Sequence, residues 1–516
     1  MFKSHNYITT PIYYVNGSPH IGHAYTSAAA DSLARWLRLD KNHSVFFATG
    51  TDEHGQKIEK AAKDAGKNVK LFCDEVADEF KELAKALALS NDYFVRTTDE
   101  SHKKAAQKFW SKLLQNGFIY KGKYEGWYAI RDEAFYSQKE IINGKAPTGA
   151  DVEWKSEECY FFKLSAFEPV LLELYKQNPS MIKPASRLNE VVSFVASGLN
   201  DLCVSRSNFS WGIKAPNDPE HVMYVWLDAL TNYLSLLGYE DGENYNKFWL
   251  SDSAFKLHLV GKDILRFHAV YWPAFLIAQS ISLAELESGK YNLNSLQKNL
   301  PSQIFAHGWW TKDGEKMSKS LGNVVDPFDI VKTYGLDKFR YFMLASASFG
   351  GDANFTIEDF IAKTNADLVN NFGNLVQRTL TIIHKNFNGL LELDAKPELD
   401  DDFKYLLNTN LQAELNPHIQ NLAFEKALSS VMLYSSKANE FIDKQAPWKL
   451  LKEDTQKAKQ VLYTLCIAIR QIGDCLACFC PEFYAKFNNF FTEFNAEPKM
   501  PLVIKTTAPS ILFDRI

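Results

Sequence analysis

The start of the chain alternates between β-type and helical patterns. Residues 6–15 are β-branched and aromatic, and residues 22–39 carry the apolar spacing of a helix. A second strand-like segment at 44–49 and a helical segment from about Gln56 repeat this order. Strand, helix and strand over so short a length form a βαβ unit, so the pattern predicts a parallel α/β sheet.

The texture of the sequence changes near residue 117. From there to about residue 217, short aromatic runs alternate with Gly, Pro and Asn, which indicates an inserted mixed α/β domain. The α/β pattern resumes near Met223. From Asp359 onward the spacing is almost wholly helical and ends in a short tail at 496–516, which predicts a helical C-terminal third.

Composition sets limits on this picture. The chain has 516 residues, of which 46% are apolar, which excludes a disordered protein and predicts roughly three domains. Its net charge of −5 lacks the basic excess usual for nucleic-acid partners. We see no secretory signal and no apolar stretch of the roughly 18–20 residues that a membrane helix needs. A soluble cytoplasmic protein is expected, with seven cysteines that form no disulfide framework.

The segment His20-Ile21-Gly22-His23 stands between a predicted strand and a predicted helix. A helix N-terminus offers free N–H groups and the positive end of the helix dipole, so it attracts phosphate. Histidines three residues apart point to the same side, and a glycine lets a base or sugar approach the backbone. Two histidines that only cap the helix are an equally good interpretation of this segment alone.

A second segment, Lys316-Met317-Ser318-Lys319-Ser320, lies between nearby glycines. Two lysines in such a loop form a mobile cationic clamp, which suits a triphosphate. A solvated basic turn is the commoner structure for a Lys-Ser loop, and it is the better interpretation of this segment taken by itself.

Together, the two segments resemble the paired signatures of class I aminoacyl-tRNA synthetases. Further stretches at 11–20, 49–55, 224–230 and 261–264 are similar to the methionyl-tRNA synthetases, and the similarity covers essentially the whole chain. The resemblance implies a ligase that activates L-methionine with ATP, releases pyrophosphate and transfers methionine from the adenylate to the 3′ end of tRNA. No covalent enzyme intermediate is needed, so positioning and charge stabilisation carry the rate.

The resemblance also implies the fold, a class I Rossmann-type catalytic domain with an inserted connective domain, followed by an α-helical anticodon-binding bundle. The expected parts are the catalytic halves at 1–116 and 223–322, the connective domain at 117–222, a stem-contact linker at 323–365 and the anticodon-binding domain at 366–516. Some relatives carry a further dimerising domain, which has no counterpart up to Ile516, so a monomer is expected.

By resemblance, the ATP site takes residues from both signature segments. These are His20 and His23 at the reacting phosphates, Gly22 at the adenosine, Asp263 at the ribose, and Lys316, Ser318 and Lys319 at the β- and γ-phosphates. Mg²⁺ is expected to accompany ATP, held mainly by phosphate oxygens and water.

Two stripes at helical spacing suit a methionine side chain, because sulfur packs well against aromatic rings. One contains Trp226, Ala229, Leu230 and Tyr233, and the other contains Ile264, His268 and Trp272. Plain core packing is the alternative for each position. By resemblance, the methionine site comprises Ile12, Tyr14, Asp52, Trp226, Ala229, Leu230, Tyr233, Ile264, His268 and Trp272, with Asp52 holding the substrate ammonium.

The helical third supplies the RNA interpretation. An apolar stripe is predicted at Leu368, Phe372, Leu375, Thr379 and Ile383, with a polar row on the other side. Such a row hydrogen-bonds base edges, and an exposed Trp after a proline stacks on an unpaired base; a merely polar face and a hydrophobic lid are the alternatives. By resemblance, Asn370, Asn374, Arg378, Pro447 and Trp448 recognise the CAU anticodon of tRNA(Met), initiator tRNA included.

No structural zinc is expected. Many relatives carry Cys-x-x-Cys knuckles in the connective domain, whereas 126–133 and 143–149 contain no cysteine here. Cys475, Cys478 and Cys480, near Cys466, lie in an apolar helical run and are expected to be buried core.

Two other functions remain open. One is a nucleotidyl transferase that acts on a different acid, against which the helical domain argues. The other is a non-catalytic tRNA-binding paralogue, which would be expected to lack one of the two signatures. Lys214 also departs from the proline that relatives commonly carry there. This departure and the missing zinc ligands bear on metal content and not on activity.

Overall fold

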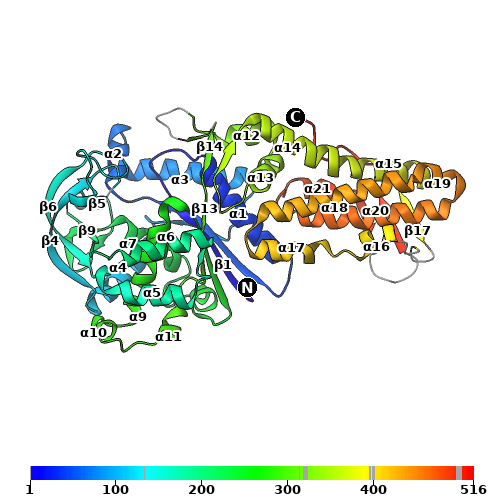
Figure 1. Ribbon diagram of the computed structural model, residues 1–516. Coiled ribbons are helices and arrows are strands. Elements are labelled where there is room, and N and C mark those ends of the chain that lie inside the picture. The colour runs from blue at the N-terminus through cyan, green and yellow to red at the C-terminus, as the bar shows by residue number, and fades with distance from the viewer. Residues whose placement is uncertain are drawn as a thin grey trace.

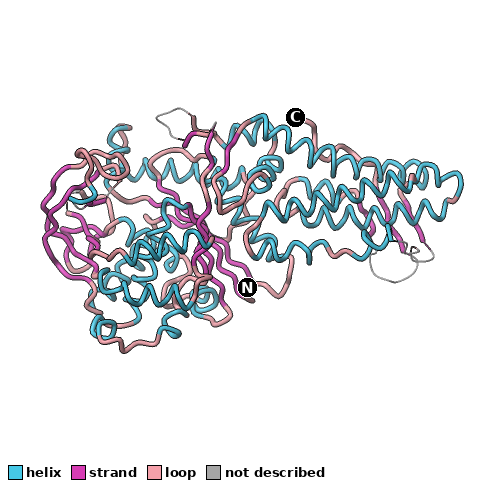
Figure 2. Tube along the Cα trace, in the orientation of Figure 1, coloured by secondary structure: helices cyan, strands magenta, loops and turns pink. Residues whose placement is uncertain are grey.

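A computed structural model describes residues 2–132, 134–136, 138–207, 209–312, 314–317, 323–393, 397, 401–494 and 502–516. Strands gather in one half of the elongated molecule and long helices fill the other (Figures 1 and 2). A parallel α/β sheet followed by a helical bundle confirms the predicted fold class.

The first half is built on a six-stranded parallel sheet in the order β3-β2-β1-β12-β13-β7. Its strands are β1 (His5–Tyr14), β2 (Ser44–Asp52), β3 (Tyr93–Arg96), β7 (Ile182–Lys183), β12 (Ala254–Gly261) and β13 (Gln303–His307). The chain adds β2 and β3 on one side of β1, and β12 and β13 on the other. This reversal creates a switch point, where ligands bind at the carboxyl ends of the strands.

Helices connect these strands as the periodicity predicted. The first is α1 (Ile21–Arg38), within a residue of the expected 22–39, and α2 begins at Gln56 as expected. The helices of this half are α1, α2 (Gln56–Asp64), α3 (Val69–Ala86), α4 (Glu100–Gln115), α7 (Val225–Ser235), α8 (Glu243–Tyr245), α9 (Trp272–Ser280), α10 (Leu283–Glu287) and α11 (Leu293–Gln297), with irregular turns η3 (Asn246–Leu250), η4 (Lys262–Ile264) and η5 (Phe267–Tyr271).

The insertion is mixed, as predicted, and contains a four-stranded antiparallel sheet in the order β5-β4-β6-β8. Its elements are β4 (Ile119–Ala129), β5 (Ala134–Tyr136), β6 (Glu153–Phe162), β8 (Leu202–Cys203), β9 (Ser205–Arg206), β10 (Lys214–Ala215), β11 (Asp218–Met223), α5 (Glu168–Gln177) and α6 (Ala185–Ala196), with turns η1 (Gln138–Glu140) and η2 (Leu164–Phe167). Cys159 and Cys203 are paired as a disulfide between β6 and β8. This pair corrects the expectation from the cysteine count, because adjacent strands bring together residues that are 44 positions apart in sequence.

A small sheet and two helices join the halves. The sheet has the order β15-β14-β16. The elements are β14 (Trp310–Lys312), β15 (Glu315–Lys316), α12 (Pro327–Tyr334), α13 (Leu336–Ala345) and β16 (Ala353–Phe355). From β16 the chain enters one continuous helical run formed by α14 (Ile357–Thr364), η7 (Asn365–Gly373) and α15 (Asn374–Phe387).

Among the described residues, the bundle contains six further helices and, contrary to the helical prediction, a three-stranded sheet. These helices are α16 (Asp401–Asn408), α17 (Leu411–Gln420), α18 (Phe424–Gln445), α19 (Pro447–Glu453), α20 (Thr455–Leu476) and α21 (Phe483–Asn488). The strands are β17 (Leu390–Leu393), β18 (Phe491–Phe494) and β19 (Leu502–Thr506). Each of these strands is only four or five residues long, which is too short for an alternating pattern to be recognised in the sequence. In addition, β17 pairs with β19, which lies more than 100 positions away.

A buried arginine ties the two halves together. Arg340 of α13 has no exposed surface, and its guanidinium lies 2.7 Å from the Asp31 carboxylate of α1. It also donates to the carbonyl oxygens of Leu87 at the end of α3 and of Phe479 just after α20, both at 2.8 Å. One apolar core runs continuously from Ile8 in β1 into the bundle.

Candidate active site

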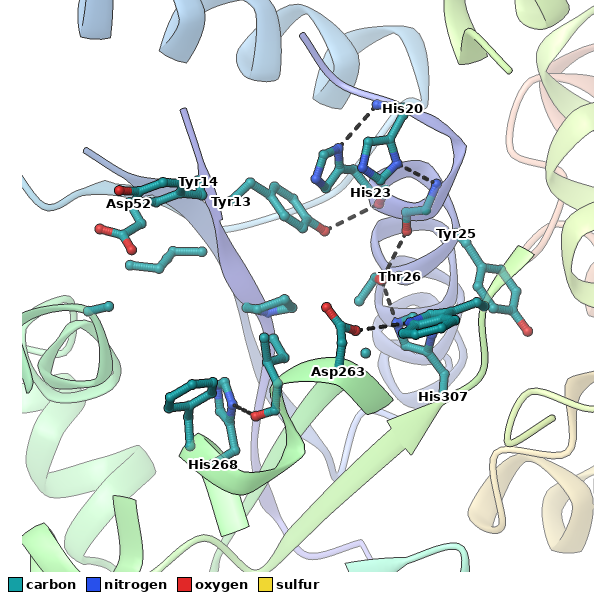
Figure 3. A pocket seen from close by; sticks show the side chains of 18 of the residues that line it. Tyr13, Tyr14, His20, His23, Tyr25, Thr26, Asp52, Asp263, His268 and His307 are labelled. Carbon is teal, nitrogen blue, oxygen red and sulfur yellow. Dashed lines mark hydrogen bonds between the residues drawn. The ribbon is translucent and has the colours of Figure 1, made fainter. Parts of the chain in front are cut away.

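A cavity of about 520 Å³ opens at the switch point of the sheet. The last residues of four adjacent parallel strands line it, namely Tyr14, Asp52, Gly261 and His307. In Figure 3, Tyr14 and Asp52 lie at one end, His20, His23 and Thr26 lie at the other, and Asp263 lies near Thr26 and His307. The cavity therefore has two ends of different chemistry on one continuous wall.

The N-terminus of α1 is capped by the two histidines of the first segment. The Gly22 N–H donates to His20 Nδ1 and the His20 N–H donates to His23 Nδ1, both at 3.1 Å. The two rings stack with centroids 3.7 Å apart, which confirms that they point to the same side. A β-carbon on residue 22 would lie 2.9 Å from the His20 ring, so Gly22 leaves room for that ring over the helix start.

His307, which the sequence analysis missed, continues this end of the cavity. Its Nδ1 lies 2.7 Å from the Gly308 carbonyl oxygen and its Nε2 lies 2.7 Å from Thr26 Oγ1. Burial lowers the pKa of His307, so the ring is neutral, with Nδ1 donating and Nε2 accepting. The only sequence signal was its position as the last residue of an apolar strand.

At the other end, Asp52 and Tyr14 are register partners on β2 and β1. Asp52 is 7% exposed, so its carboxylate is screened from bulk water while it still lines the cavity. The Lys57 ammonium lies 5.7 Å from the centroid of the Tyr14 ring. A partly enclosed carboxylate of this kind suits a charge-assisted bond to a ligand ammonium.

The predicted stripe on α7 faces the cavity. Trp226, Ala229, Leu230 and Tyr233 all line it, as do Ile12, Ile264 and His268. Trp226 stacks on Phe267, a lining residue that the sequence analysis missed, at a centroid distance of 3.6 Å. The aromatic wall is thus assembled from α7 and the η4–η5 segment.

His268 is held as a neutral ring within this wall. Its Nδ1 donates to the Ile264 carbonyl oxygen at 3.0 Å, and its Nε2 accepts from the Tyr233 hydroxyl at 2.7 Å. Burial lowers its pKa to about 4. Trp272 is placed differently from the prediction, because it is fully buried behind Tyr233, with ring centroids 6.0 Å apart, and does not line the cavity.

Buried charges support the carboxyl end of β2 from behind. Asp228 of α7 accepts from His54 Nδ1 at 2.6 Å and from His102 Nε2 at 2.7 Å. Burial raises the pKa of this carboxyl, but the two imidazoles outweigh that effect and hold the pKa at about 2. Glu53 is bound by the Arg96 guanidinium at 2.6 and 2.9 Å. The two residues that follow Asp52 in the chain, Glu53 and His54, are thereby held in place.

The second signature segment is described only in part. β15 ends at Lys316, which pairs with Thr311 of β14, and Met317 lines the cavity. The side chain of Lys316 and the whole of Ser318 and Lys319 lie outside the described residues. The described part of the segment thus reaches the cavity at Met317.

Comparisons with known proteins give the same family along the whole chain. A family model, "tRNA synthetases class I (M)", matches residues 6–151 and 145–380. The chain is 49% identical to a methionine–tRNA ligase of Rickettsia bellii over 92% of this chain and 90% of that protein, and 45% identical to that of Rickettsia typhi over the full length of both. The chain belongs to the methionine–tRNA ligases, a family of class I tRNA synthetases.

A solved structure supports the same assignment. The Mycobacterium tuberculosis methionyl-tRNA synthetase in complex with methionyl-adenylate superposes with a TM-score of 0.89 at 38% identity, over 99% of this chain and all of that one. The resemblance drawn from the signature segments is thus confirmed, and this methionine–tRNA ligase has the class I fold.

The helical half of this methionine–tRNA ligase presents the residues that resemblance assigned to the anticodon. The predicted apolar stripe on η7 and α15 is buried, and Asn370 and Asn374 are exposed. Trp448 is 42% exposed, and the Arg378 guanidinium lies 5.7 Å from its ring centroid and 2.5 Å from the Asp443 carboxylate. Pro447 is buried at the first position of α19, directly after the left-handed residue Ala446.

The C-terminal cysteines are buried and unpaired, which confirms that they belong to the core. Within the described ranges we find no group of three or more His, Cys, Asp or Glu side chains placed to hold a metal ion. No helix in that part of the chain has both the length and the apolar composition needed to cross a bilayer.

Proposed function

We propose that the cavity catalyses methionyl-adenylate formation from L-methionine and the Mg²⁺ complex of ATP. A methionine carboxylate oxygen attacks the α-phosphorus, the bond from that phosphorus to the pyrophosphate oxygen breaks, and pyrophosphate leaves. The terminal adenosine of tRNA(Met), initiator tRNA included, then attacks the activated carbonyl and AMP leaves. Membership in the methionine–tRNA ligase family and the conjunction of Asp52 with the α1 N-terminus on one cavity wall support this reaction.

The methionine would occupy the end of the cavity that contains Asp52. Asp52 binds its ammonium, and the thioether lies against the rings of Tyr14, Trp226 and Tyr233. The remaining side chains proposed for this site are Ile12, Ala229, Leu230, Ile264 and His268 on the wall and Trp272 as support behind it.

The nucleotide would occupy the other end. His20 and His23 stabilise the reacting phosphates at the positive end of α1, Gly22 admits the adenosine and Asp263 binds the ribose. Lys316 and Lys319, with Ser318, hold the β- and γ-phosphates. The Mg²⁺ ion is taken to be bound mainly by phosphate oxygens and water.

The same proposal assigns the anticodon to the far end of the molecule. Asn370, Asn374 and Arg378 contact the CAU bases, and Trp448, which Pro447 positions, stacks on one of them. We further propose that the enzyme acts as a monomer in the cytoplasm, and the mass of the purified protein in solution tests the monomer.

Methionine-dependent exchange of pyrophosphate into ATP tests the activation step. Exchange is expected with methionine and not with leucine, isoleucine, valine or cysteine at the same concentration. Exchange driven by one of those amino acids would refute the substrate assignment. Exchange with no added amino acid would refute the reaction.

A further inference from the structure

Four side chains form a connected cluster on the rim of the cavity, beside the nucleotide end. They are Lys262, Asp263, Trp309 and Asp352, and we refer to them as the rim cluster. Lys262 and Asp263 follow the last residue of β12, Trp309 follows β13, and Asp352 precedes β16. Asp263 and Trp309 line the cavity, whereas Lys262 and Asp352 lie outside its lining.

Asp352 holds two members of the cluster. Its two carboxylate oxygens lie 2.6 and 2.7 Å from Lys262 Nζ, and one of them accepts from the Trp309 backbone N–H at 2.8 Å. The hydrogen bond from Lys262 and then that from Trp309 lower the pKa of Asp352. The Lys262 ammonium also lies 4.2 Å from the centroid of the Trp309 ring, so the indole is fixed at its backbone and over its face.

The fixed indole in turn holds Asp263. Trp309 Nε1 donates to Asp263 Oδ1 at 3.1 Å, which leaves the other carboxylate oxygen of Asp263 for a ligand. In Figure 3 this carboxylate lies between His268 and Thr26, where the two ends of the cavity meet. The α-phosphate of ATP reacts at this junction, and the ribose is bonded to that phosphate, so a ribose contact belongs directly beside it.

The backbone beneath the cluster is closely packed. The Ala353 N–H donates to the Trp309 carbonyl oxygen at 2.8 Å, and the Gly308 N–H donates to the Phe349 carbonyl oxygen at 3.2 Å. A β-carbon on Gly308 would lie 2.0 Å from the Gly351 carbonyl oxygen, so only glycine permits this crossing. Asp352 is thus set at a fixed distance from Trp309 by the chain itself.

We propose that Asp352 and Trp309 are positioning residues for the nucleotide, acting by orienting Asp263 toward the ribose. This inference rests on the proposed adenylation function. A lysine–aspartate pair near the surface contributes little to stability. We therefore assign the Lys262–Asp352 pair the role of fixing the position of the Trp309 indole. If Asp352 instead restrained Lys262 from binding a phosphate, removal of the Asp352 charge would lower the KM for ATP.

The test compares the KM for ATP with the KM for methionine in pyrophosphate exchange. Trp309→Phe keeps an aromatic ring and removes the indole N–H, and Asp352→Asn keeps the shape and removes the charge. We expect the KM for ATP to rise roughly fivefold and threefold respectively, as loss of one hydrogen bond predicts, with the KM for methionine unchanged within twofold. The double variant should show less than the product of the two effects, because both act through Asp263.

Two further measurements separate positioning from general damage. Wild-type enzyme should bind 2′-deoxy- or 3′-deoxy-ATP more weakly than ATP, and this difference in affinity should be smaller in Trp309→Phe. Asp252→Asn removes another exposed partner of a lysine, Lys298 at 2.9 Å, away from the cavity, and should change neither KM.

Several outcomes would overturn the inference. These are an unchanged KM for ATP in both variants, a lower KM for ATP in Asp352→Asn, an equal rise in both KM values, or an undiminished deoxy-ATP difference. Wild-type enzyme without methionine-dependent exchange would instead refute the proposed function, and that result appears before any variant is made.

Discussion

The catalytic cavity and the anticodon face use polar groups in opposite ways. In the cavity, His268, His307 and Asp52 are buried, and the two histidines are already bonded to other parts of the chain. On the anticodon face, Asn370 and Asn374 are exposed on a helix, and Trp448 has 42% of its surface in solvent. The cavity is therefore preorganised by its own network, whereas the face depends on water-exposed groups set at helical spacing.

This difference predicts separable effects of mutation. A change in the cavity disturbs neighbours and leaves buried groups without partners, so it alters activation and stability together. A change on the anticodon face removes a contact with little effect on folding, so it alters charging alone. The following predictions test this separation, beginning with the largest expected effect.

Asp52→Ala should nearly abolish activation. Truncating one partner of a buried charge pair costs about 2–5 kcal/mol, so the kcat/KM for methionine in exchange should fall roughly a hundredfold or more. The KM for ATP should change much less, and binding of tRNA in a filter assay should be retained. A loss of less than about tenfold would show that another group holds the ammonium.

Trp448→Ala should separate charging from activation. Base stacking is worth about 1–3 kcal/mol, so the kcat/KM for tRNA should fall roughly ten- to a hundredfold while exchange is unchanged. Trp154→Ala removes another exposed tryptophan, on β6 in the insertion, and serves as the matched control with normal charging. An equal loss of charging and exchange in Trp448→Ala would contradict the anticodon assignment.

Tyr233→Phe should lower stability and weaken methionine binding without weakening ATP binding. The change removes the hydroxyl that donates to His268 Nε2, and a buried acceptor without a donor costs about 1–3 kcal/mol. We expect the KM for methionine to rise roughly three- to tenfold with the KM for ATP unchanged, measured by exchange. Equal increases in the two KM values would show that this hydroxyl supports the fold as a whole and has no specific role at the methionine end of the cavity.

The smallest predicted effect is on the pH dependence of stability. The folded pKa of His268 is about 4, below its ordinary value, so the unfolded chain binds more protons between these two values. The contribution of His268 is therefore fully present above pH 6.5 and is lost as pH falls toward 4. As pH falls over this range, the melting temperature of His268→Gln should decline less than that of wild type. Parallel curves of melting temperature against pH for the two proteins would exclude a buried, neutral His268 ring.

Local pattern was sufficient for the elements that carry the site. The β-branched and aromatic run in 6–15 and the apolar spacing in 22–39 predicted β1 and α1 to within a residue, because both elements are long and mostly buried. The helical spacing of the stripe on α7 likewise placed its four residues on one wall of the cavity. Long-range partners were not predictable, since Thr26 and His307 meet across 281 positions of sequence and Trp309 meets Asp352 only through strand pairing. Trp272 shared the spacing of its stripe but lies one layer deeper.

Arg340 determines how this chain comes apart. Its guanidinium bonds to α1, to the end of α3 and to the end of α20, and breaking such a buried pair costs about 3–5 kcal/mol. Because Arg340 and one continuous apolar core connect the catalytic half to the bundle, we expect the two to melt as one cooperative unit and not in succession. A protease or a shortened gene that divides the chain near residue 365 would separate Arg340 from the Phe479 carbonyl oxygen and divide the shared apolar core, so we expect neither piece to retain the stability of the whole.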